Sequence, residues 1–160
     1  MCYRCYLATD GLLSSVPMTN PPTFSVELLT VDQVQGLALP FPAGWSVAKV
    51  GAHTGCGCGF HSNPDWPWLE ERTVDEDEIS SRHRLADFIN RLMPARVQMF
   101  SHWEVDPTPE PSGRLTASAF WIADHWDPLP DGWLVEIDLA APSPDHPWAE
   151  GPIPGKSFYP

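Results

Sequence analysis

The chain has 160 residues, of which 21 are acidic and nine are basic, so its net charge is −12. Such a charge repels phosphate backbones and anionic lipid surfaces, and we therefore expect neither a nucleic-acid partner nor a membrane partner. There is no stretch of roughly 20 apolar residues and no signal-peptide pattern, which favours a cytoplasmic protein, and a chain of this length can bury a core as one domain.

The first third of the chain is predicted to consist mainly of strands. Residues 2–9 are rich in strand-favouring aromatic side chains, and residues 23–29 alternate apolar and polar side chains. Thr30 and Gln33 have the spacing of a capping box, which predicts a short helix directly after them. Residues 45–53 are predicted to form a strand that leads into a loop rich in glycine and cysteine.

The clearest helix is predicted over about 76–92. Apolar side chains recur there at the spacing of one helix face, and they are Leu85, Phe88, Ile89 and Leu92. Further strands are predicted over 95–104 and 133–139, whereas residues 114–123 are compatible with either a strand or a helix.

These elements predict an α+β fold. Strands outnumber helices, and one long helix separates two groups of strands, so we expect a single domain over 1–140 with a mostly antiparallel sheet. Residues 141–160 contain too many prolines for regular structure and are predicted to form an extended or disordered tail.

The four cysteines occur as two pairs, Cys2-x-x-Cys5 and Cys56-x-Cys58. In a reducing compartment such cysteines favour metal binding or catalysis over disulfides. Side chains three apart on a strand point to opposite faces, so we expect Cys5 to be a small buried residue that faces away from Cys2. Cys56 and Cys58 are two residues apart between glycines, and extended backbone would point both sulfurs to one side.

The predicted site is a metal centre in which the first strand meets the loop at 51–61. Its ligands are predicted to be the thiolates of Cys2, Cys56 and Cys58 together with the imidazole of His53 or His61. This combination favours zinc and also admits copper(I) or iron. Four protein ligands would make a closed structural site and three would leave an open position, and the sequence is compatible with both.

Two segments also carry a resemblance. MCYRCYLATD at the start and GAHTGCGCGF at 51–60 resemble small bacterial proteins that begin Met-Cys, continue Tyr-Leu-x-Thr-Asp and carry a Gly-Cys-x-Cys segment. No activity is assigned to those proteins. The resemblance implies that Cys2, Cys56 and Cys58 belong to a shared pattern, whereas Cys5 is particular to this chain.

Two other chemistries remain open, and with them the question of whether the protein is an enzyme. Removal of Met1 would give Cys2 a free α-amino group, which can act as general base to its own thiol in N-terminal nucleophile hydrolases. The Met-Cys start is similar to that of class II glutamine amidotransferases and abasic-site crosslinking proteins, which continue with glycine where this chain has Tyr3. The third chemistry is thiol redox cycling of Cys56 and Cys58 against Cys2.

Overall fold

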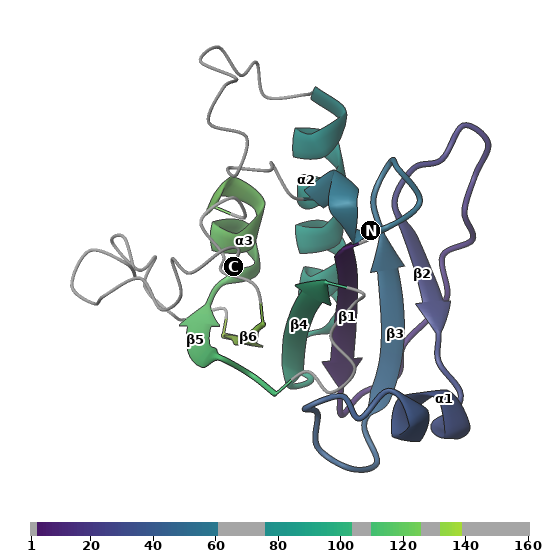
Figure 1. The fold of residues 1–160 in the computed structure, drawn as a ribbon. Helices are drawn as coiled ribbons and strands as arrows, with labels where there is room; N and C mark the ends of the chain where they lie inside the picture. Colours follow the sequence, from purple (N-terminus) through teal and green to yellow (C-terminus); the bar gives the residue numbers. More distant parts are fainter. Residues whose placement is uncertain (1–2, 61–75, 104–109, 126–131, 139–160) are drawn as a thin grey trace, which may run out of the picture.

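The computed structural model describes residues 3–60, 76–103, 110–125 and 132–138. Within them, six strands form one sheet in the order β2-β3-β1-β4-β6-β5 (Figure 1). The strands are β1 (Tyr3–Thr9), β2 (Ser25–Leu28), β3 (Ser46–Gly51), β4 (Val97–Trp103), β5 (Gly113–Ala117) and β6 (Trp133–Ile137). Neighbouring strands are antiparallel except for β5 and β6, which are parallel, so the predicted α+β fold with a mostly antiparallel sheet is confirmed.

The helices are α1 (Val31–Gly36), α2 (Glu76–Leu92) and α3 (Ala119–His125), with a short 3-10 helix, η1 (Gly57–Phe60). Helices α2 and α3 pack against each other and share one hydrophobic core with the sheet. Leu85, Phe88 and Ile89 of the predicted apolar face are buried in this core. None of the helices in the described ranges is long and apolar enough to cross a membrane.

The strand register determines which side chains of β1 reach the core. Cys5 pairs with Val50 of β3 and with Ser101 of β4, and it lies in the core together with Tyr3 and Leu7. Its exposed fraction is 0%, which confirms the prediction that Cys5 is a buried residue.

The segment that the sequence left ambiguous contains both kinds of structure. β5 ends at Ala117, and α3 begins two residues later. The hydroxyl of Ser118, between them, accepts a hydrogen bond from the backbone N–H of Trp121 at 3.1 Å. Ser118 therefore ends the strand and caps the helix, because a serine hydroxyl at this position satisfies one of the unpaired amides of the first turn.

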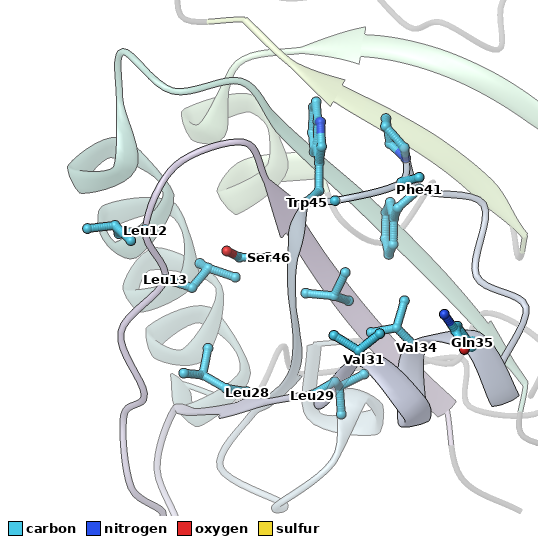
Figure 2. Close-up of a pocket in the computed structure, with 14 residues that line it drawn as sticks. Leu12, Leu13, Leu28, Leu29, Val31, Val34, Gln35, Phe41, Trp45 and Ser46 are labelled. Carbon is cyan, nitrogen blue, oxygen red and sulfur yellow. The ribbon is translucent and has the colours of Figure 1, made fainter.

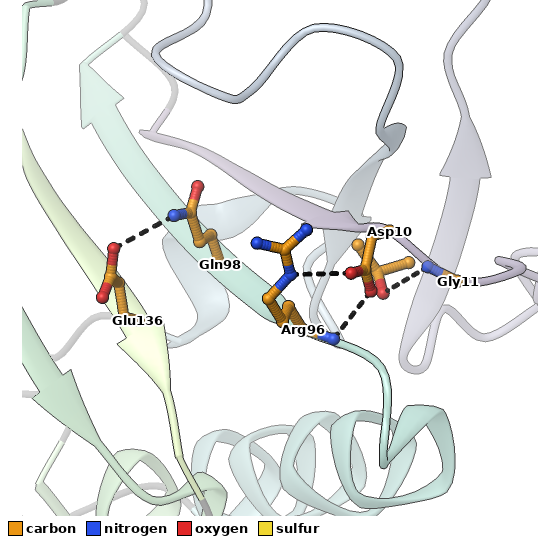
Figure 3. A network of polar contacts seen from close by, with 6 residues as sticks. Asp10, Gly11, Arg96, Gln98 and Glu136 are labelled. Atoms are coloured by element: carbon orange, nitrogen blue, oxygen red, sulfur yellow. Dashed lines mark hydrogen bonds and ion pairs between the residues drawn. The ribbon is translucent and has the colours of Figure 1, made fainter.

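Polar contacts join β4 to its two neighbouring strands (Figure 3). The carboxylate of Asp10 accepts hydrogen bonds from the backbone N–H of Arg96 at 2.8 Å and from its Nε at 2.7 Å. Gln98 of β4 donates through Nε2 to Glu136 of β6 at 3.2 Å. The first contact fixes the point at which the chain leaves β1 and enters β4.

Candidate functional site

The cysteine loop packs against the N-terminal end of β1. The backbone N–H of Tyr3 donates a hydrogen bond to Sγ of Cys58 at 3.0 Å. Gly57 lies so close to β1 that a Cβ atom at this position would be 2.7 Å from the carbonyl oxygen of Tyr3. Only glycine fits here without a shift, so this position brings η1 and the first strand together, as the sequence predicts for the 51–61 loop.

A tight turn precedes η1. The amide of Ala52 donates to the carbonyl of Cys56 at 3.0 Å, and the amide of Gly55 donates to the carbonyl of Ala52 at 2.8 Å. Gly55 has a φ of 78°, a left-handed conformation that glycine adopts without a steric penalty. The Thr54 hydroxyl lies 3.5 Å from Sγ of Cys56, so the half-buried thiol of Cys56 sits beside a polar group.

The expected extended backbone across both cysteines is wrong. The chain turns into the 3-10 helix at Gly57, so Cys58 lies inside a helical turn and the two-residue periodicity of a strand does not apply to it. Cys56 and Cys58 nevertheless lie near each other. Gly57 lies close to β1, and Gly59 lies close to Ala52. Both contacts need this compact turn, because extended backbone would move one of the two glycines out of contact.

His53 is held between the loop and α2. Its backbone N–H donates to the hydroxyl of Ser81 at 3.1 Å, and its ring Nδ1 lies 3.3 Å from the same hydroxyl. A Cβ atom on Gly59 would lie 2.9 Å from Cε1 of His53, so the imidazole rests against η1. Because Ser81 engages Nδ1, the other ring nitrogen, Nε2, is the one left for a metal.

The described residues supply only part of the predicted ligand set. Among them, no three histidine, cysteine or acidic side chains are grouped closely enough to hold a metal ion, so His53, Cys56 and Cys58 do not form a complete centre on their own. Cys2 and His61 lie outside the described residues. The complete set of ligands therefore stays a prediction.

Cys5 lies beside this loop through its backbone, but its side chain is fully buried in the core. Burial raises the pKa of the Cys5 thiol far above its ordinary value, so this side chain stays protonated. Metal ligation requires a thiolate, and burial disfavours that form at Cys5.

Sequence reasoning missed the contribution of Tyr3. Its backbone N–H contacts the sulfur of Cys58, and a backbone donor leaves no signal in the sequence. Its side chain anchors this end of β1, because the hydroxyl lies 2.8 Å from the hydroxyl of Ser101 and the ring packs edge-on against Trp103. The tyrosine is 1% exposed.

A backbone donor lies at the sulfur of Cys58, because the Tyr3 N–H points to it at 3.0 Å. Hydrogen bonds of this kind tune the sulfur ligands of metal centres. A cysteine with a backbone donor at its sulfur is compatible with a soft-metal ligand and with a nucleophilic sulfur. The chain matches no family model, no curated protein and no solved structure.

Proposed function

We propose that the protein binds one zinc ion through the thiolates of Cys2, Cys56 and Cys58, with His53 or His61 as a fourth ligand. The single observation that supports this most strongly is the 3.0 Å contact between the sulfur of Cys58 and the backbone nitrogen of Tyr3. That nitrogen belongs to the peptide bond between Cys2 and Tyr3. The sulfur of Cys58 therefore contacts the backbone atom that directly follows Cys2 in the chain.

The chemistry of the loop also supports zinc. Thiolate and imidazole ligands in a tetrahedral set suit zinc, and the net charge of −12 attracts divalent cations. The turn from Ala52 to Cys56 leads directly into η1, so Cys56 and Cys58 lie near each other on glycine-rich backbone, as a pair of zinc ligands requires.

The test is native electrospray mass spectrometry of the untagged full chain, repeated under denaturing conditions. We expect the native mass to exceed the denatured mass by one zinc ion. Cys2→Ser, Cys56→Ser and Cys58→Ser should each lose the ion, whereas Cys5→Ser should keep it and serves as the matched control. Binding should weaken at acid pH, because zinc displaces protons from the thiols.

Three results would overturn the proposal. The first is a wild-type chain that takes up no zinc from excess zinc salt. The second is a Cys58→Ser chain that retains it. The third is equal loss of zinc in Cys5→Ser while its circular dichroism is unchanged. A metal-free chain that lacks Met1 and carries a free α-amino group would instead favour Cys2 as a nucleophile.

A further inference from the structure

A cavity of about 510 Å³ lies at the end of the sheet opposite the cysteine loop. It opens where β3 begins, whereas the cysteine loop follows the point where β3 ends. Figure 2 shows aromatic and aliphatic side chains around it, with Phe41 and Trp45 near Val31 and Val34 on one side of the strand that carries Ser46. Its volume falls within the range of about 300–1,000 Å³ that is common for binding pockets, although it is open to solvent on one side.

Helix α1 forms one wall of this cavity without burying any of its own residues. It has only six residues, and isolated helices of that length are not stable in water. A capping box between Thr30 and Gln33 fixes its first turn, with hydrogen bonds of 2.8 and 3.3 Å. Val31 is 71% exposed and Val34 is half-buried, so the described residues leave most of the Val31 side chain uncovered.

We propose that this cavity is the docking site of the proline-rich C-terminal segment of the same chain, residues 139–160. The strand register shows where that segment starts. Ile137 of β6 pairs with Val97, Val97 pairs with Thr9, and Thr9 pairs with Ser46 at the cavity. The last residue of β6, Ile137, thus lies at the same end of the sheet as the cavity, three strands away.

The reach of the segment is sufficient. Three strand spacings amount to about 14 Å, because adjacent strands lie about 4.8 Å apart. The 22 residues that follow Asp138 span about 70 Å in the extended polyproline conformation. Less than half of the segment therefore covers the distance, and the remainder is free to lie along the cavity.

The chemistry of the segment matches the walls. It contains six prolines and one tryptophan, Trp148, and proline-rich segments dock in aromatic grooves because their backbone is already extended. Phe41 and Trp45 supply the aromatic side chains of such a groove. The covalent connection also raises the effective concentration of the segment to the millimolar range.

The test is hydrogen exchange with mass spectrometry on the full chain. In the variant Trp148→Ala, we expect amides of residues 30–36 to exchange about tenfold faster than in the wild type. In the variant Val31→Asp, we expect faster exchange in peptides from 139–160. Lys156→Ala is the matched control within the segment, and residues 113–117 of β5 are the internal control, with no change expected in either.

The results that would overturn the proposal are distinct. One is that wild-type residues 139–160 exchange as fast as an unstructured peptide while Trp148→Ala leaves residues 30–36 unchanged. Another is protection that disappears on dilution, which would assign the cavity to a second copy of the chain. Both readouts are independent of zinc, so they do not depend on the proposed metal site.

Discussion

Replacement of Gly57 by alanine tests whether η1 is held against β1 by close backbone contact. A Cβ atom would lie 2.7 Å from the carbonyl oxygen of Tyr3 and 3.1 Å from the amide nitrogen of Cys5. Both neighbours are backbone atoms of a strand that is paired on two sides, so they cannot rotate away. The loop must therefore move, and the hydrogen bond from Tyr3 to Cys58 must lengthen or break.

The expected loss of stability follows from the cost of overpacking. Forcing an extra methyl group into a packed site costs about 1–3 kcal/mol. Because a domain of this size unfolds with about 5–15 kcal/mol in total, the loss is a sizeable fraction of the stability. The melting temperature should fall by about 2–4 °C for each kcal/mol.

The assay is urea unfolding followed by circular dichroism, with and without a zinc chelator. Gly36→Ala is the control, because no atom lies within 4 Å of its added Cβ and α1 favours alanine. We expect Gly57→Ala to be destabilised and to bind zinc more weakly, and Gly36→Ala to match or exceed the wild type by up to about 1 kcal/mol. Equal stability and equal zinc affinity in the two variants would refute the close packing of η1 on β1.

Three further predictions concern single side chains. In the folded protein, iodoacetamide should leave Cys5 unlabelled, because burial raises the pKa of its thiol and excludes the reagent; mass spectrometry of tryptic peptides before and after denaturation checks this. The side-chain and backbone hydrogen bonds from Arg96 hold the pKa of Asp10 below its ordinary value of 3.8. These hydrogen bonds therefore stabilise the fold above pH 3.8, and this stabilisation is lost as the pH falls through the lower pKa of the folded state. Asp10→Asn should therefore flatten the acid side of a stability profile measured by urea unfolding, and an unchanged slope would contradict this origin. Tyr3→Phe removes the buried contact to the Ser101 hydroxyl and should lower the free energy of unfolding by about 1 kcal/mol, whereas a more stable variant would show that the contact is unfavourable.

The elements that could be predicted from the sequence are those with strong periodicity. The apolar positions of α2 recur at helical spacing, and the structure places the helix at Glu76–Leu92, as predicted. The alternation of residues 133–139 likewise predicts β6. The burial of Cys5 is predicted from strand alternation together with the apolar character of Tyr3 and Leu7, which share its face.

The features that could not be predicted depend on contacts between distant segments. The turn of the chain at Gly57 follows from the proximity of β1, which lies about fifty residues earlier. The parallel pairing of β5 with β6 follows from the helix between them, which the mixed composition of residues 114–123 concealed. The cavity beside α1 arises where several separate segments meet, and no one of them carries a signal for it.

The register between β1 and β4 also bears on how the chain folds. Tyr3 pairs with Trp103, although β2, β3 and α2 lie between β1 and β4 in the chain. Pairings between residues this far apart slow folding, because the entropic cost of closing a long loop comes before any stabilising contact can form. During synthesis the first strand therefore emerges from the ribosome long before β4 exists to pair with it. Until β3 and β4 have been made, Cys5 has no strand on either side, so the nascent chain exposes a thiol that the finished sheet buries completely.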